Sequence, residues 1–214
     1  WFGGYEVYIA ADLSGSMNET MHGVKKNDSQ RDMVFLLVDS CMSASVAAKQ
    51  ADRRLKAPMP VKVSVVVFGM KTEIVLPLTQ EWTPKEQITL YRALDAGAGG
   101  GTPDHKALAL IERQAEEAEQ ADEDAHRAAA NLQKHDWRMR RFVIATADGG
   151  SNDSRLVKET NDRLQEAGIP VDLFLIASED DVYLKQAAAE SYQSVELVPD
   201  VRDLAEKGLS RLTD

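Results

Sequence analysis

The sequence predicts a doubly wound, Rossmann-like α/β fold, in which helices cover both faces of one mainly parallel six-stranded sheet. Six short segments rich in β-branched and apolar residues alternate along the chain with stretches of helical periodicity. Four of the six are almost continuously apolar, which is typical of strands covered on both faces. The 214 residues are enough for one such domain with a full core.

The elements follow one another with short connections. The expected strands lie at 5–11, 61–69, 72–78, 140–147, 171–177 and 193–198. The expected helices lie near 31–56, 84–95, 103–135, 153–167, 180–190 and 200–212. Only Met70 and Lys71 separate the second strand from the third, too few residues for a crossover, so these two are expected to pair antiparallel. Pro77 places the third strand at an edge of the sheet.

The stretch from Pro103 to Asp136 is too long for one helix packed within such a domain. As a single helix it would be about 51 Å long, which exceeds the body of a domain of this size. Residues 112–124 hold seven acids and one Arg, whereas 127–141 hold five basic residues and one Asp. We therefore predict a break near 121–123 and an antiparallel helical pair that sets acids opposite bases. The chain is then one domain over 1–214 with a charged helical insertion at about 112–140.

Composition restricts the partners. Lys and Arg number 25 against 35 Asp and Glu, a net charge of −10, which disfavours nucleic acid and anionic membranes as partners. No apolar run approaches the roughly 20 residues needed to cross a bilayer. Cys41 is the single cysteine, so an intrachain disulfide is ruled out and a cytoplasmic location is favoured. The first residue is Trp1, from which we expect a larger parent protein.

Oxygen-bearing side chains follow the expected strands at three places. The DLSGS run carries Asp12, Ser14 and Ser16, the GGGTP run carries Thr102 and the ADGG run carries Asp148. In a doubly wound sheet such strand ends meet at one edge, where ligands bind. Two carboxylates and three hydroxyls suit a hard divalent cation such as Mg²⁺. The sequence therefore predicts a magnesium site.

Each of these motifs also has a purely structural interpretation. Asp12 or Ser14 can cap a helix, Thr102 before Pro103 is a good helix cap, and Asp148-Gly149 is a common turn dipeptide. Other chemistries fit less well, because the glycine-rich run at 97–106 lacks the Lys-Ser or Lys-Thr pair of a phosphate loop. The histidines show no zinc spacing and are expected on the surface; they are His22, His105, His126 and His135.

The three motifs together resemble the metal-ion-dependent adhesion site (MIDAS) of von Willebrand factor A (VWA) domains. That family combines D-x-S-x-S after an apolar strand, a Thr about 85 to 90 residues later, and Asp-Gly after another strand, and the likeness runs from Tyr5 to about Leu212. The resemblance implies that the hydroxyls of Ser14, Ser16 and Thr102 contact the metal, while the two aspartates act largely through bound water. It also implies Mg²⁺, with Mn²⁺ or Ca²⁺ as alternatives, and a free position for a partner's Asp or Glu carboxylate.

Residues near the motifs are candidates for a rim that contacts the partner. Asp104 and His105 begin the helix that follows Thr102, and the same position would also serve the helix dipole. The loop 17–30, with Asn18 and His22, is expected to overhang the site and shape partner choice, unless it is a plain solvated loop.

The leading hypothesis is a non-enzymatic recognition module that binds an acidic residue of a partner through Mg²⁺. The alternatives are a Mg²⁺-dependent hydrolase or phosphoryl-transfer enzyme and a structural domain with an inactive site. The enzyme needs a cationic clamp for phosphate, for which Lys25, Lys26 and Lys106 are the candidates. The GGTP motif and the acidic, cysteine-poor composition look more like intracellular bacterial members of the VWA family, such as chelatase subunits and relatives encoded beside AAA+ ATPases. This likeness implies an AAA+ ATPase as a candidate partner.

Overall fold

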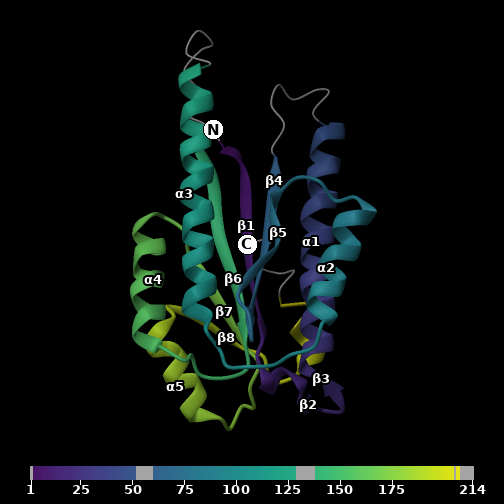
Figure 1. Ribbon diagram of the computed structural model, residues 1–214, viewed down its shortest axis with the longest axis vertical. Helices are drawn as coiled ribbons and strands as arrows, with labels where there is room; N and C mark the ends of the chain where they lie inside the picture. Colours follow the sequence, from purple (N-terminus) through teal and green to yellow (C-terminus); the bar gives the residue numbers. More distant parts are fainter. Residues whose placement is uncertain (1, 52–59, 129–137, 205, 208–214) are drawn as a thin grey trace.

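The computed structural model describes residues 2–51, 60–128, 138–204 and 206–207. Its central feature is a six-stranded sheet in the order β5-β4-β1-β6-β7-β8 (Figure 1). The strands are β1 (Phe2–Leu13), β4 (Val61–Gly69), β5 (Glu73–Thr79), β6 (Arg138–Ala147), β7 (Val171–Leu175) and β8 (Ser194–Leu197). Every neighbouring pair is parallel except β4 and β5. The predicted fold class and the antiparallel edge strand that carries Pro77 are confirmed.

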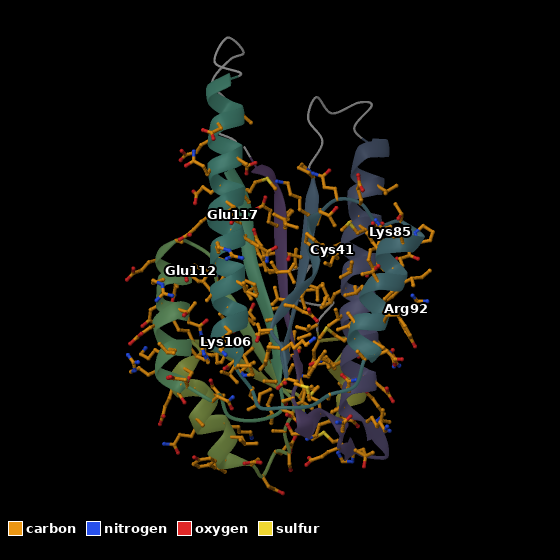
Figure 2. All side chains as sticks on the ribbon, viewed as in Figure 1. Cys41, Lys85, Arg92, Lys106, Glu112 and Glu117 are labelled. Atoms are coloured by element: carbon orange, nitrogen blue, oxygen red, sulfur yellow. The ribbon has the colours of Figure 1, made fainter. Side chains whose placement is uncertain are left out.

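Helices cover both faces of the sheet (Figure 1). One face carries α1 (Lys26–Ala51) and α2 (Pro84–Asp95), and the other carries α3 (Asp104–Ala128), α4 (Ser154–Glu166) and α5 (Val182–Ser191). Strand β1 supplies alternate residues to the two cores, since Ile9 packs with the α1 layer and Tyr8 with the α3 layer. Figure 2 shows Cys41 buried between α1 and the sheet, with Lys85 and Arg92 on the outer side of α2. None of the described helices combines the length and apolar character needed to cross a membrane.

Strands β1 and β6 lie side by side at the centre of the sheet. They pair in parallel with Ala11 opposite Thr146, so Asp12, near the end of β1, and Asp148, directly after β6, lie at the same edge. A residue in a parallel strand advances about 3.3 Å along the strand, so register alone brings the two carboxylate-bearing loops together. The adjacency expected from the sequence is confirmed.

The prediction of a loop at 17–30 is wrong, because most of this segment lies in regular secondary structure. A 3₁₀ turn, η1 (Gly15–Asn18), leads into a two-stranded hairpin of β2 (Thr20–Met21) and β3 (Val24–Lys25). Helix α1 then begins at Lys26, five residues earlier than expected. At the other end of the chain, the short helix η2 (Val201–Asp203) opens the expected helix at 200–212. Residues 52–56 and 208–212 of the expected helices lie outside the described residues.

The predicted break near 121–123 is also wrong, since α3 runs without interruption from Asp104 to Ala128. Residues 129–135, the expected second arm of the pair, lie outside the described residues. Two acids in the second half of α3, Glu119 and Asp122, have basic partners on strands of the sheet. Arg141 of β6 lies 3.3 Å from Asp122 and 3.9 Å from Glu119, and Lys62 of β4 lies 3.8 Å from Asp122.

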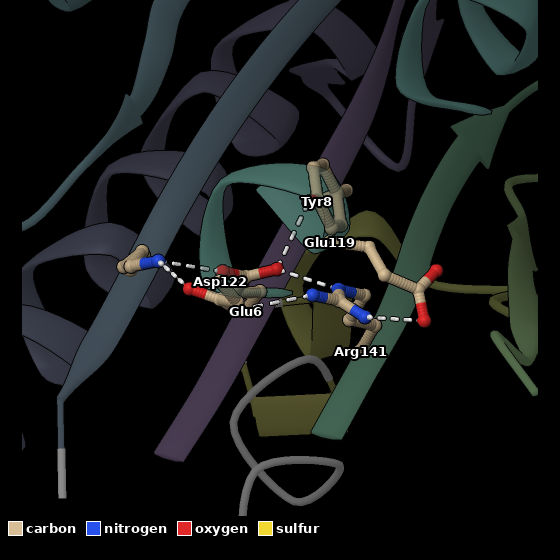
Figure 3. Close-up of polar contacts among 6 residues, drawn as sticks. Glu6, Tyr8, Glu119, Asp122 and Arg141 are labelled. Atoms are coloured by element: carbon tan, nitrogen blue, oxygen red, sulfur yellow. Dashed lines mark hydrogen bonds and ion pairs between the residues drawn. The ribbon is translucent and has the colours of Figure 1, made fainter. Parts of the chain in front are cut away.

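A buried glutamate holds these charges in place (Figure 3). Glu6 of β1 is fully buried, and its carboxylate accepts hydrogen bonds from Arg141 Nε at 2.7 Å and Lys62 Nζ at 2.8 Å. The Tyr8 hydroxyl donates to the same carboxylate at 3.3 Å. A buried carboxylate costs several kcal/mol unless it is paired and hydrogen-bonded, and here it has two cations and a phenol. The cluster fixes the second half of α3 against the sheet.

Candidate metal centre

Backbone hydrogen bonds join the segments that carry the predicted site. The amide of Gly99 donates to the carbonyl of Leu13 at 2.7 Å, and the amide of Gly15 donates to the carbonyl of Gly100 at 3.1 Å. The GGGTP run is thus joined directly to the DLSGS run.

The third segment is held through Thr102 and Asn152. The Thr102 amide donates to the Asn152 side-chain oxygen at 3.1 Å, and the Asn152 amide donates to the Thr102 carbonyl at 3.0 Å. Asn152 lies four residues after Asp148, in the same loop. The three sequence motifs therefore meet at one end of the sheet.

Glycine is required where these loops approach each other. Gly100 has a φ of +80°, and a Cβ there would lie 2.7 Å from the Met70 amide nitrogen. A Cβ on Gly69 would lie 2.3 Å from the carbonyl oxygen of Leu13. No side chain fits at these distances, and the positive φ of Gly100 is unfavourable for L-residues.

Four of the five predicted residues are linked by one series of short hydrogen bonds. Oδ1 of Asp12 accepts from the Ser14 amide at 2.6 Å. The hydroxyls of Ser14 and Ser16 lie 3.0 Å apart, and the Ser16 hydroxyl donates to Oδ1 of Asp148 at 2.6 Å. Ser14 precedes η1 but makes no capping hydrogen bond with its side chain, so its hydroxyl is not used as a helix cap. Asp12, Ser14, Thr102 and Asp148 are buried and Ser16 is half-buried.

One carboxylate oxygen at this site lacks a hydrogen-bond partner in the described part of the chain. Oδ2 of Asp12 is buried and, among the described residues, accepts no hydrogen bond. Burial raises the pKa of Asp12 to about 7, the hydrogen bonds from Ser14 oppose this rise, and the charges of Asp148 and Asp104 add to it. A buried, unsatisfied carboxylate oxygen is unfavourable, and a cation beside it would remove the penalty.

Lys26 places a positive charge on the other carboxylate. Its Nζ donates to Oδ2 of Asp148 at 2.7 Å and to Oε2 of Glu19 at 3.1 Å. The side chain of Lys26 is 10% exposed and that of Asp148 is fully buried, whereas that of Glu19 is 69% exposed. Burial acts to lower the pKa of Lys26, but Asp148 and then Glu19 outweigh it, and the net shift is upward. Lys26 is therefore charged.

Gln30 fixes the position of Lys26 relative to the strands. It lies one helical turn after Lys26 on α1, and its Nε2 donates to the carbonyl of Asp12 at 2.7 Å. Its Oε1 accepts from the Thr146 hydroxyl at 2.6 Å. The first turn of α1 is thereby attached to both carboxylate-bearing strands.

The rim residues of the first loop take different positions. The Asn18 side chain donates to the carbonyl of Ala98 at 2.8 Å and so connects η1 to the glycine-rich loop. His22 has a φ of +52° and is exposed at the turn of the β2–β3 hairpin. Arg202 holds the pKa of Asp200 well below its usual range, and His22 contributes to this shift through its charge.

Asp104 is not the exposed rim residue that was expected. It is 3% exposed and accepts hydrogen bonds from the hydroxyls of Ser151 and of Tyr192, the latter at 2.9 Å. Burial raises the pKa of Asp104, while these hydrogen bonds oppose the rise. His105 is half-buried rather than on the surface, and its Nδ1 has no hydrogen-bond partner among the described residues.

The site fits a hard cation only if hydroxyl oxygens take part. Among the described residues, no group of three or more His, Cys, Asp or Glu side chains is placed to hold a metal. The hydroxyls of Ser14 and Ser16 and the carboxylate of Asp148 are already in contact, the Asp12 carboxylate is held by the Ser14 amide, and the segment carrying Thr102 lies beside them. Together with the unpartnered Oδ2 of Asp12, this all-oxygen set matches the ligand preference of Mg²⁺ or Mn²⁺.

Sequence reasoning missed the roles of Lys26 and Gln30. Lys26 was considered only as a clamp for phosphate, whereas its ammonium is paired with Asp148 and Glu19. The helical periodicity of α1 contained a signal for these two contacts. The buried stripe of α1 contains Met33 and Leu37, and stepping back by three and then four residues reaches Gln30 and Lys26. Polar residues that continue a buried stripe toward a strand end indicate contacts with the site.

Solved structures of VWA domains share this fold. The von Willebrand factor domain of the type V pili tip protein Mfa5 from Porphyromonas gingivalis superimposes with a TM-score of 0.66 at 9% identity, over 100% of this chain and 95% of that one. The VWA domain of SpRpn10 gives 0.61 at 13% identity, over 95% and 94%. Manganese-loaded TRAP from Plasmodium vivax gives 0.54 at 12% identity, over 95% and 71%.

The chain therefore has the fold of a VWA domain, and at these identities the likeness concerns the fold alone. The sequence matches no family model and no curated protein.

Proposed function

We propose that this chain is a metal-dependent protein-recognition module. Asp12, Ser14, Ser16, Thr102 and Asp148 would hold a Mg²⁺ ion, with Mn²⁺ or Ca²⁺ as substitutes. The ion, when bound, supplies a Lewis acid with a position for a carboxylate oxygen of a partner protein. The observation that carries the proposal is the contact of the Ser14, Ser16 and Asp148 side chains beside Asp12, whose buried Oδ2 accepts no hydrogen bond from the described residues.

The charges around the site favour binding over catalysis. A phosphoryl-transfer or hydrolytic enzyme needs free cations to clamp phosphate. Lys26, the candidate that lies at the site, is already paired with Asp148 and Glu19 and so is not free to clamp phosphate. A partner that presents Asp or Glu suits the cation, and the net charge of −10 disfavours nucleic acid.

The identity of the partner is a further part of the proposal. The likeness to intracellular VWA domains makes an AAA+ ATPase the first candidate and the cytoplasm the expected location. The manganese-loaded TRAP structure supports the choice of a divalent ion, because that protein, with a similar fold, holds one.

Calorimetry on chelator-stripped protein tests the metal. Mg²⁺ and Mn²⁺ should bind at one site, and at a free concentration of 100 times Kd they should stabilise the fold by about 2.7 kcal/mol. Ser14→Ala should weaken binding, whereas Asp32→Asn, at an exposed side chain of α1, should leave it unchanged. Absence of binding at millimolar metal would overturn the proposal.

Peptide selection tests the partner chemistry. A random peptide library panned in Mg²⁺ and eluted with chelator should yield ligands with an essential Asp or Glu. Replacing that acid by its amide should abolish binding. Ligands that bind equally in chelator would contradict recognition through the metal.

A further inference from the structure

The ammonium of Lys26 binds the carboxylate of Asp148, which the proposed metal ion would also use. Nζ of Lys26 lies 2.7 Å from Oδ2 of Asp148, and that carboxylate side chain is fully buried. The remaining oxygen of Asp148 accepts from Ser16. In this arrangement both oxygens of Asp148 are occupied, one by a hydroxyl of the predicted site and one by an ammonium of the same chain.

The position of the ammonium is built into the fold. Lys26 is the first residue of α1, and its amide donates to the Glu19 carbonyl at 3.1 Å. One turn later, Gln30 connects the helix to the carbonyl of Asp12 and the hydroxyl of Thr146. The backbone of Lys26 is therefore fixed beside the site from both sides, and the ammonium is delivered to Asp148 by the fold.

Glu19 gives the same ammonium a second partner. Its carboxylate lies 3.1 Å from Nζ of Lys26 and is 69% exposed, while Asp148 is buried. Lys26 thus bridges one carboxylate inside the site and one at its surface. If a divalent ion binds Asp148, the ammonium of Lys26 would remain paired with Glu19 and move toward solvent, where water stabilises its charge.

We propose that Lys26 is a tethered cation that competes with the divalent ion for Asp148 and so sets the metal affinity of this chain. The inference rests on the proposed function, because it concerns the same oxygens. Two like charges within a few ångströms repel strongly in a partly buried site. The chain then loads metal only where the free ion concentration is high enough to displace Lys26 from Asp148.

Charge-removal variants test the competition. Lys26→Gln keeps a hydrogen-bond donor for Asp148 and removes only the charge, and Lys26→Met removes both. Each should bind Mg²⁺ at least about tenfold more tightly than wild type in calorimetry. Lys25→Met is the matched control, because it removes the same charge one residue away at an exposed side chain, and it should change the Kd by less than about twofold.

Thermal melting supplies a second readout, in which the difference between Lys26→Met and wild type depends on whether metal is present. In chelator, Lys26→Met should melt below wild type, because Asp148 loses its counter-charge. In saturating Mg²⁺ the difference should vanish or reverse. If Lys26→Met fails to fold without metal, Lys26→Gln carries the same test.

A double-mutant cycle isolates the role of Glu19. Glu19→Gln should weaken Mg²⁺ binding in the wild type, because the displaced ammonium loses its second partner. The same substitution should have little effect in the Lys26→Gln background. An effect of equal size in both backgrounds would overturn the bridging role.

The outcomes separate the two proposals. Equal or weaker Mg²⁺ binding by both Lys26 variants, with wild type still binding, overturns the competition and leaves the metal site standing. Absence of Mg²⁺ binding in wild type and in both Lys26 variants overturns the metal site and the competition together.

Discussion

The hydroxyl of Thr146 donates a hydrogen bond to Oε1 of Gln30 at 2.6 Å, and both groups are buried. The same Gln30 side chain donates to the carbonyl of Asp12 at 2.7 Å. One amide from α1 therefore bridges β1 and β6, the two strands that carry the carboxylates of the proposed site. This bridge adds a side-chain link to the backbone register that brings Asp12 and Asp148 together.

Gln30→Leu should lower the free energy of unfolding by about 2 kcal/mol, because it leaves a buried carbonyl and a buried hydroxyl without their amide partner. Urea unfolding followed by tryptophan fluorescence measures the change. Gln165→Leu, at an exposed position on α4, should stay within about 0.5 kcal/mol of wild type. A Gln30→Leu protein as stable as wild type would show that the bridge contributes little.

Gly100→Ala and Gly97→Ala form a matched pair. Both glycines have positive φ, +80° and +90°, so alanine costs each about 1–2 kcal/mol of backbone strain. At Gly97 the new methyl group meets nothing within 4 Å, whereas at Gly100 it meets the backbone of Met70. Gly100→Ala should therefore have the lower melting temperature and, since Gly100 holds Gly15, the weaker Mg²⁺ binding. Equal melting temperatures for the two variants would contradict the close approach.

Glu6→Gln should destabilise the fold by about 3–5 kcal/mol, because it leaves Arg141 and Lys62 short of a buried counter-charge. Metal-induced stabilisation should be unchanged, because Glu6 lies about 20 Å from Asp12 along β1 at 3.3 Å per residue. Denaturant unfolding with and without Mg²⁺ measures both quantities. Glu159→Gln, whose side chain is 48% exposed, is the control and should have little effect. A loss of metal response in Glu6→Gln would show that the two ends of the sheet are coupled.

The thiol of Cys41 should react only when the protein unfolds. Burial raises the pKa of Cys41 to about 12, and the residue is 3% exposed, so the reactive thiolate is scarce and inaccessible at pH 8. Alkylation by iodoacetamide should be slow in the native protein and should slow further when Mg²⁺ is added. Rapid labelling of the folded chain would show that α1 separates from the sheet locally.

The parts of the fold that follow from local apolar pattern were predictable. The continuous apolar runs before Asp12 and Asp148 identified β1 and β6, and the two-residue gap after Gly69 identified the edge hairpin. The strand ends then placed the predicted carboxylates at one edge of the sheet.

The remaining features depend on contacts between distant segments. The first turn of α1 is polar, so periodicity placed the helix start at 31 and missed Lys26 and Gln30. Charge polarity along α3 was correctly noticed, and two of its acids, Glu119 and Asp122, meet Lys62 and Arg141 on strands, while the expected second arm lies outside the described residues. Local sequence carries no information on which distant base an acid will meet.

The register of β1 against β6 gives the proposed site a use as a reporter. Ala11 lies opposite Thr146, and side chains alternate between the two faces of a sheet. A slip of one residue would carry Asp148 about 3.3 Å along the strand and turn it to the opposite face. In a redesigned, truncated or circularly permuted form of this chain, retained Mg²⁺ affinity would therefore show that β1 and β6 pair in the native register. A measurement of helix content does not detect such a register shift.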